Sequence, residues 1–178
     1  MRYEAGNRVI SPAAVVLGAA AAIIVLFIAA WPAIKYRSPD WHKVAITEYT
    51  VDVCAELGVP SALPLSVFLV ESSLWKRHMT FKKWEARHRF YVYSVPQISY
   101  NTAYGDGFRG EPDELMDYTV AIYWAVRHMK TLMYVYDGDI CKVIMAYNAG
   151  DCVSGNYGYL DKVLKIYRTY YPLFECGK

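Results

Sequence analysis

A long uncharged segment near the amino end most constrains how this 178-residue chain can fold. Residues 11–34 contain no charged side chain, and those from Ala13 to Trp31 are apolar throughout. About 20 such residues form a helix long enough to cross the hydrocarbon core of a bilayer. We therefore expect a short tail at residues 1–11 and a transmembrane anchor at residues 12–34, with the folded domain built from the remainder.

A cleavable signal peptide is the alternative interpretation of this segment. Its apolar core would span only about 7–15 residues and would end at a small-x-small site. The sequence Ile28-Ala29-Ala30 before Trp31 is a poor match to such a site, which favours the anchor. The positive-inside rule gives almost no orientation, because basic residues flank the segment on both sides: Arg2, Arg8, Lys35, Arg37 and Lys43.

Beyond the anchor we expect a linker at residues 35–43, where Pro39 blocks helix continuation, and one folded domain at residues 44–178. Apolar residues recur at helical spacing through most of this domain. The pattern predicts a mainly α fold with at most a short strand near residues 90–95. The expected helices cover residues 44–57, 63–75, 112–136, 140–148 and 159–170.

Glu71 is the single charged residue of the helix expected at residues 63–75. It lies on one stripe with Val67, Phe68 and Leu74, at positions i−4, i−3 and i+3. Burial among apolar groups and the negative end of the helix dipole would both raise its pKa, so that it could donate a proton near neutral pH. This segment alone leaves open the alternative of an ordinary helix-end glutamate turned to solvent.

Three further motifs follow Glu71-Ser72 along the chain. They are Gln97 with Thr102-Ala103, the run from Ala146 to Gly150 that reads Ala-Tyr-Asn-Ala-Gly, and Tyr159. In this order and at these spacings, residues 44–172 resemble the lytic transglycosylase family, the soluble-transglycosylase-like domain related to goose-type lysozyme. Each motif alone occurs by chance in many chains, whereas four in the right order are specific.

The resemblance implies a lysozyme-like helical domain and a role for each matched residue. Glu71 would be the catalytic acid and base, and the substrate-binding residues would be Ser72, Gln97, Tyr147, Asn148 and Tyr159. In the family, the segment matching Gln97 and Thr102-Ala103 lines the cleft, the segment matching Tyr147-Asn148 forms its far wall, and the late tyrosine closes the site. Asn148 could orient the acid or bind an acetamido group, or could instead cap its own helix before Gly150.

The chain also departs from the family pattern. Ser73 stands where the family has Gly, and Ser94-Val95-Pro96 stands where it has Gly-Leu-Met. The gap from Glu71 to Gln97 is longer than is usual. We expect Pro96 to hold the loop before Gln97 extended.

The implied substrate is the glycan strand of peptidoglycan, cleaved between N-acetylmuramic acid and N-acetylglucosamine. Hydrolysis by either common route needs a second carboxylate, and the matched motifs contain only Glu71. The resemblance implies instead that the muramyl acetamido group and C6 hydroxyl complete the reaction. The product would be a 1,6-anhydro sugar, and no cofactor is expected.

Two alternatives remain open. A hydrolytic lysozyme on the same fold would need a second acid, for which Glu85, Asp106 and Asp151 are loop candidates. An inactive membrane-bound structural or assembly protein that keeps the fold is the other, although the joint presence of Glu71, Gln97 and Tyr147-Asn148 argues against it.

Because peptidoglycan lies outside the cytoplasmic membrane, the resemblance implies a tail on the inner side and residues 35 onward on the peptidoglycan side. The expected location is the bacterial inner membrane and periplasm, or the membrane of a phage virion. A minimal domain tied to a membrane suits local opening of the wall, with phage virion or secretion-machine proteins as expected partners.

Basic residues gather in residues 76–89, interleaved with aromatic ones, and Glu85 is the only acid there. We do not expect nucleic acid as a partner, because the net charge is only +2 and the chain shows no nucleic-acid-binding motif. The segment is expected to form a flap beside the cleft that grips peptide carboxylates or anionic headgroups, or else a solvated loop face.

The four cysteines, Cys54, Cys141, Cys152 and Cys176, allow three pairings, and the sequence favours none. An exported domain could oxidise them. No metal site is expected, because there is no Cys-x-x-Cys and the four histidines lack ligand spacing.

Overall fold

The structure is a computed structural model that describes residues 40–74, 76–86, 89–152 and 156–176. The predicted tail and anchor, and the linker up to residue 39, lie outside these ranges. Residues 41–43, which we expected in the linker, are helical, since α2 spans Trp41–Leu57. Within the described ranges, no helix combines the length and the apolar character needed to cross a membrane.

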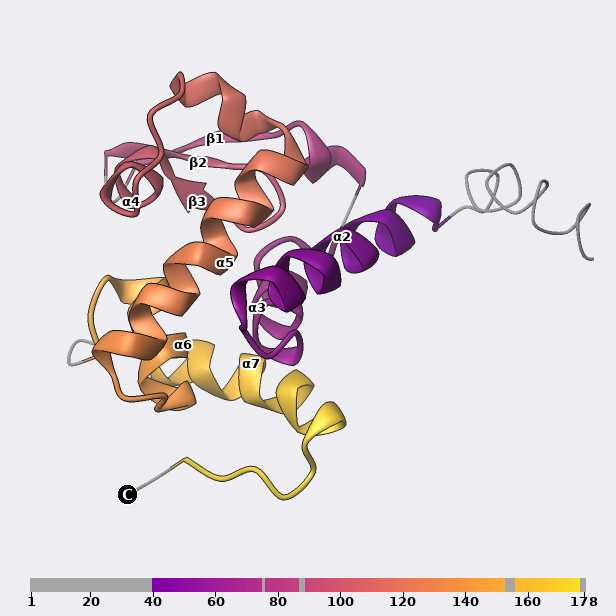
Figure 1. Ribbon diagram of the computed structural model, residues 1–178, viewed down its shortest axis with the longest axis vertical. Coiled ribbons are helices and arrows are strands. Elements are labelled where there is room, and N and C mark those ends of the chain that lie inside the picture. Colours follow the sequence, from indigo (N-terminus) through magenta and orange to yellow (C-terminus); the bar gives the residue numbers. More distant parts are fainter. Residues whose placement is uncertain (1–39, 75, 87–88, 153–155, 177–178) are drawn as a thin grey trace, which may run out of the picture. The chain divides into compact units, whose positions relative to one another are not determined.

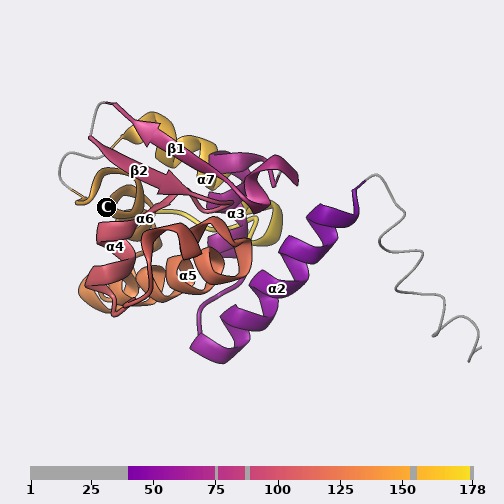
Figure 2. The ribbon, with the colours of Figure 1, turned by 90° about the horizontal axis from the view of Figure 1, so that it is seen from above.

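The described domain is mainly helical and carries a small three-stranded sheet (Figure 1). After α2 the chain forms α3 (Ala62–Ser72), the 3-10 helix η1 (Lys76–Met79), and the strands β1 (Lys82–Glu85), β2 (Phe90–Tyr93) and β3 (Ile98–Ser99). It continues with α4 (Tyr100–Gly105), the 3-10 helix η2 (Pro112–Met116), α5 (Tyr118–Val135), α6 (Ile140–Ala149) and α7 (Tyr157–Tyr170). Figures 1 and 2 show the sheet beside the first half of α5, and α6 beside its second half.

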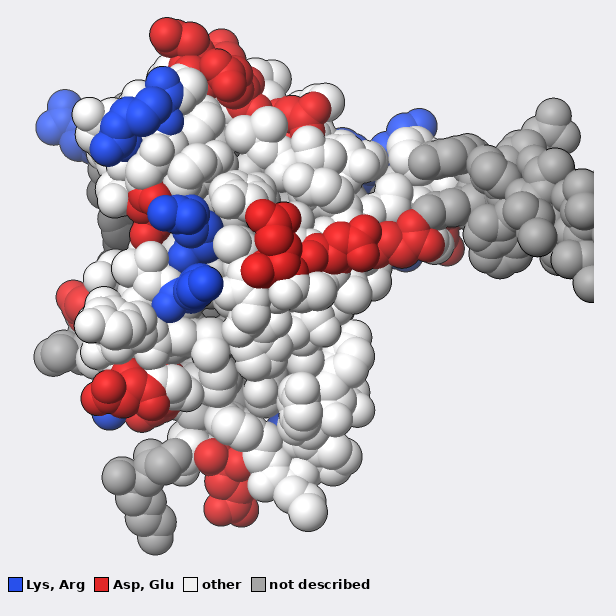
Figure 3. Space-filling view, viewed as in Figure 1, with Lys and Arg blue, Asp and Glu red and all other residues white. Residues whose placement is uncertain are grey.

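α2 buries one face and exposes an acidic one. Ile46, Val53 and Leu57 are buried at helical spacing. Exposed acids occupy the other side and form the row of red side chains along α2 in Figure 3; they include Glu48, Asp52 and Glu56. The helix ends at Gly58, whose φ of +70° suits a residue without a Cβ.

α3 is buried over most of its length, since its first seven residues, 62–68, are all buried. A helix that is apolar on every side must lie in the core. Its hydroxyl groups are satisfied within the helix, since Ser66 Oγ donates to the Ala62 carbonyl oxygen at 2.6 Å. α3 packs on α7, so these two helices form the centre of the domain.

Between residues 82 and 99, where no helix was expected, the chain forms a small sheet in place of the single short strand predicted near residues 90–95. There β1, β2 and β3 pair antiparallel in sequence order, with Lys83 opposite Val92 and Val92 opposite Ser99. Strands of four, four and two residues are too short to show a clear alternation, and only the middle one was expected.

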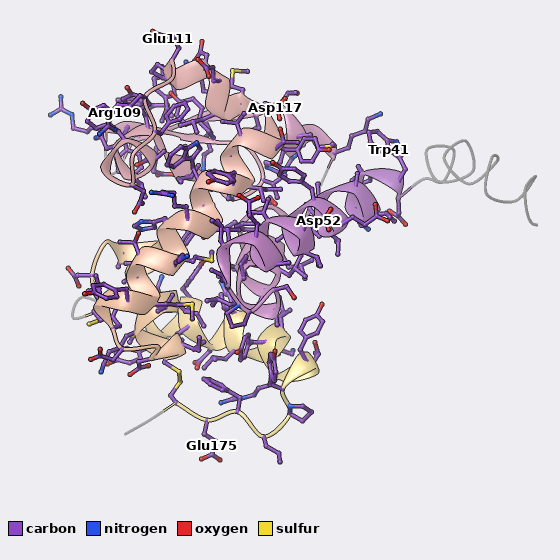
Figure 4. The ribbon with its side chains drawn as sticks, in the orientation of Figure 1. Trp41, Asp52, Arg109, Glu111, Asp117 and Glu175 are labelled. Atoms are coloured by element: carbon purple, nitrogen blue, oxygen red, sulfur yellow. A yellow bond between two sulfur atoms is a disulfide. The ribbon has the colours of Figure 1, made fainter. Side chains whose placement is uncertain are left out.

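The expected helix at residues 112–136 is two elements. η2 begins with a capping box, in which Glu114 Oε1 accepts from the Glu111 N–H at 2.9 Å. Asp117 then leaves the helical conformation, and its Oδ1 accepts from the Thr119 N–H at 2.7 Å, which starts α5 afresh. Figure 4 shows Asp117 at this first end of α5.

The structure also selects one cysteine pairing. Cys141, in the first turn of α6, is bonded to Cys176 near the carboxyl end, with Cα atoms 5.7 Å apart. This is the disulfide drawn in yellow in Figure 4. Cys54 is free and buried, and Cys152 is free and half-buried.

Candidate active site

Glu71 lies half-buried in the last turn of α3. Val67 and Phe68 beside it are fully buried, and Leu74 is 4% exposed. The helix ends directly after it, because Ser73 has a φ of 52° and its N–H bonds to the Leu69 carbonyl oxygen at 3.1 Å. This ending leaves the carboxylate at the tip of an apolar helix.

Tyr159 from α7 meets this carboxylate, 88 residues further along the chain. Its hydroxyl donates a hydrogen bond to Glu71 Oε1 at 2.6 Å, and its ring is buried. Tyr159 lies in the first turn of α7, where the Asn156 side chain caps the helix by accepting from the Tyr159 N–H at 3.1 Å. The cap therefore fixes the tyrosine that holds the acid.

Burial raises the pKa of Glu71 above its usual value. The Tyr159 hydrogen bond and the positive charge of Lys83 each lower it, but burial outweighs them. Compared with an exposed glutamate, this carboxyl group keeps its proton to higher pH. The expected rise in the pKa of Glu71 is confirmed. The alternative of an ordinary glutamate turned to solvent is wrong, because Glu71 is half-buried and accepts a hydrogen bond from Tyr159.

Tyr147 on α6 joins the same group of residues through the loop after β2. Its hydroxyl donates to the Pro96 carbonyl oxygen at 2.9 Å. Burial and the negative charge of Glu71 raise the pKa of Tyr147 well above its usual value, so the phenol stays neutral. The charge of Glu71 thus acts on a tyrosine of α6, Tyr147, and on a tyrosine of α7, Tyr159.

Gln97 ends the loop before β3, and this loop is a tight turn instead of the extended segment that we expected. The Gln97 N–H bonds to the Ser94 carbonyl oxygen at 3.3 Å, and Gln97 Nε2 donates to the same oxygen at 2.6 Å. Pro96 is accommodated inside this turn because its missing N–H is not needed there. The side chain of Gln97 is thereby fixed by its own loop.

Both serines that stand at family glycines have left-handed backbone. Ser73 has a φ of 52° and Ser94 a φ of 54°, a region that favours glycine and costs other residues free energy. At both positions the chain thus has the conformation that a glycine adopts most easily.

The other four motif residues, Ser72, Thr102, Ala103 and Asn148, have surroundings of a different kind. Ser72 is buried and donates to the Phe68 carbonyl oxygen of its own helix at 3.0 Å. Ser99 caps α4 because its hydroxyl oxygen accepts from the Thr102 N–H at 3.1 Å, and Ala103 is fully buried in the core. The cleft-lining role of the Thr-Ala pair stays a prediction. Asn148 is exposed on the last turn of α6, which ends at Gly150 in the left-handed region. The substrate-binding roles of Ser72, Gln97, Tyr147, Asn148 and Tyr159 stay predictions.

Lys83 is a residue of the site that motif reasoning did not single out. It lies on β1, its charge acts on Glu71, and its Nζ is 3.3 Å from Glu85 Oε2. The basic segment is therefore built partly as a strand, and Lys83 and Glu85 lie on the same face of it. The alternation of Lys82 and Trp84 with Lys83 and Glu85 was the available signal, but four residues are too few to assign its faces.

The three candidate second acids are held differently. Glu85 is on the sheet face of Lys83 and pairs with it. Asp106 Oδ2 is 2.6 Å from His128 Nδ1, and its Oδ1 accepts from the Thr131 hydroxyl at 2.7 Å. Burial raises the pKa of Asp106, but these two hydrogen bonds outweigh it, and the pKa lies below its usual value. Asp151 is exposed in the loop after α6.

None of these three acids is among the groups that shift the pKa of Glu71. Apart from burial, those groups are Tyr159 and Lys83.

Within the described ranges, no three His, Cys, Asp or Glu side chains come together as metal ligands would. The arrangement that the structure does contain is a half-buried carboxyl group, a tyrosine that orients it and a nearby cation.

Comparison with known proteins supports the same assignment. The chain matches the family described as the transglycosylase SLT domain over residues 56–168, which is more than half of its length and includes Glu71, Gln97, Tyr147 and Tyr159. The search of the curated proteins gave no match. On the family match, the chain belongs to the transglycosylase SLT domain family and is a peptidoglycan lytic transglycosylase.

Proposed function

We propose that the chain is a membrane-anchored lytic transglycosylase that cleaves the β-1,4 bond between N-acetylmuramic acid and N-acetylglucosamine and forms 1,6-anhydro-N-acetylmuramic acid. The observation that carries this proposal is the surroundings of Glu71. Its pKa is raised by burial, Tyr159 binds one of its oxygens, and no acid is among the groups that shift its pKa. In the proposed reaction this one carboxyl group acts as both acid and base.

The reaction requires two proton transfers at Glu71. With Tyr159 bound to Oε1, the other carboxyl oxygen carries the proton and gives it to the leaving glycosidic oxygen as the bond to C1 breaks. The muramyl acetamido oxygen stabilises the cationic C1 from the opposite face. Glu71, now a carboxylate, takes the proton of the C6 hydroxyl as O6 bonds to C1. Atoms balance without water, and Glu71 ends protonated as it began.

Lys83 suits the first step, in which Glu71 gives up its proton. When Glu71 has lost its proton, a nearby ammonium group stabilises the carboxylate and so limits how basic it becomes. Tyr159 does the same through its hydrogen bond. Burial, which opposes these two groups, keeps the acid protonated before the reaction.

To test this proposal, peptidoglycan sacculi are digested with the full-length chain and the muropeptides are analysed by mass spectrometry. We expect ends one water lighter than hydrolytic products, unchanged by borohydride, and free of label when the digestion runs in heavy-oxygen water. Glu71→Gln should abolish cleavage and keep the fold, because the amide keeps the shape of the carboxyl group. Retained activity in this variant would place the acid elsewhere.

A hydrolytic lysozyme is the second candidate, and Glu85 is the specific residue that favours it. Glu85 lies on the same sheet face as Lys83, whose charge acts on Glu71, and on this route it would activate a water molecule. Reducible, labelled ends in the same digestion, together with their loss in Glu85→Gln, would establish that route. An inactive structural protein would clear no zone in a zymogram.

The proposed location is a membrane, with the catalytic domain on the peptidoglycan side of the bacterial inner membrane or of a phage virion membrane. Support comes from the uncharged segment at residues 12–34 and from the Cys141–Cys176 disulfide, since disulfides persist in exported proteins. Local opening of the wall beside phage virion or secretion-machine proteins is the setting that we propose for such an enzyme.

A further inference from the structure

An open pocket of about 300 Å³ lies against the sheet, and none of the residues of the candidate active site lines it. Successive side chains of a strand point to opposite faces. Trp84 therefore lies on the sheet face opposite to that of its neighbour Lys83, the face that it shares with Tyr91 and Tyr93. The pocket is lined on this face by Trp84, Tyr91 and Tyr93, and beyond the sheet by Tyr100, Asn101 and Arg89.

The rings of this pocket are both exposed and held in place. Trp84 and Tyr91 are directly opposite each other in the register of β1 and β2. Their ring centroids are 4.9 Å apart at 64°, an edge-to-face pair, yet they remain 48% and 43% exposed. Two large rings that the strands fix in position and leave accessible form a ready platform for a flat ligand.

A cation connects this platform to η2. Lys82 Nζ is 4.7 Å from the centroid of the Tyr91 ring and 2.6 Å from Asp113 Oδ1. This contact ties β1 to η2, which supplies Pro112 to the pocket. The walls are therefore joined before any ligand arrives, which reduces the ordering cost of binding.

We propose that this pocket binds a sugar ring of a peptidoglycan glycan strand outside the catalytic cleft. Aromatic faces pack against the C–H side of a sugar, the Asn101 amide suits its hydroxyl and acetamido groups, and Arg89 can donate to the carbonyl oxygen of the lactyl group on muramic acid. The assignment of peptidoglycan as the ligand rests on the proposed function. A second contact of this kind keeps the strand beside the enzyme between cleavage events.

The test measures binding without turnover, using the full-length chain with Glu71→Gln. Its affinity for purified sacculi is measured by pelleting, and chitin beads serve as a second probe that has the sugar but no peptide. Trp84→Ala and Tyr91→Ala should each weaken binding to both probes about five- to tenfold. Trp84→Phe, which keeps an aromatic face, should retain most of the affinity.

Tyr134→Ala is the matched control, because Tyr134 is 88% exposed and does not line the pocket. Binding of Trp84→Ala and Tyr91→Ala equal to that of this control would overturn the proposal. Loss on sacculi but not on chitin would also overturn it, since the ligand would then be the peptide. Failure of the proposed function is a separate outcome, because it would show as absent cleavage by the parent chain whatever these affinities are.

Discussion

At the scale of single residues, the chemistry depends on three opposing influences on Glu71. Burial among Val67, Phe68 and Leu74 favours the protonated form, whereas Tyr159 and Lys83 favour the charged form. Such a balance suits a group that must first give a proton and then take one. The sequence motifs identify Glu71 and Tyr159, but they do not identify Lys83, because its approach to the acid depends on how β1 pairs.

Lys83→Met should move the alkaline limb of the pH profile to higher pH. Lys83 lowers the pKa of Glu71, so its removal raises that pKa, and the acid stays protonated and active further into the alkaline range. The measurement is kcat/KM for solubilised glycan strands as a function of pH. Lys82→Met is the matched control. Lys82 directly precedes Lys83 in β1, lies on the opposite face of the sheet and pairs with Asp113. Identical limbs in both variants would contradict the role of Lys83.

At the scale of elements, the helices were predictable and the breaks between them were less so. The helices near residues 44–57, 140–148 and 159–170 follow from long apolar periodicity. The break at Asp117 depends on one side chain, which accepts a hydrogen bond from the Thr119 N–H and so competes with helix continuation. The composition of the segment gives no sign of this break. The sheet depends on pairings between short strands, which no local pattern encodes.

Ser73→Gly should stabilise the fold without loss of activity. Ser73 ends α3 with a φ of 52°, a conformation that costs a residue with a Cβ about 1–2 kcal/mol. Glycine removes this cost but makes the unfolded chain more flexible, so we expect a net gain of about 0.5–1 kcal/mol in the free energy of unfolding. Urea denaturation measures it. Ser73→Ala, which keeps the Cβ, should show no such gain, and equal stability of the two variants would refute the argument.

At the scale of the whole molecule, the Cys141–Cys176 disulfide ties the carboxyl-terminal segment to the start of α6. It closes 35 residues, which constrains the unfolded chain by about 3–4 kcal/mol. Cys141→Ser should lower the free energy of unfolding by about this amount, whereas Cys152→Ser, at a free half-buried cysteine, should not. Mass spectrometry of unreduced peptides checks the pairing. No rule of spacing could select it, because it depends on where the segment after α7 returns to α6.

The anchor at residues 12–34 gives the last prediction, which decides where the enzyme works. A spanning helix is held by apolar burial and not by charge, so the full-length chain should stay in the membrane pellet after high-salt and carbonate washes. As a control, Ile23→Arg with Leu26→Arg places two charges at the centre of the segment, each costing about 2.5–3.5 kcal/mol there, and should release the chain. Release of the parent by salt alone would exclude the anchor, and a mature amino terminus near Trp31 would identify a cleaved signal peptide instead. Retention would confine cleavage to glycan strands within reach of the membrane, as local opening of the wall requires.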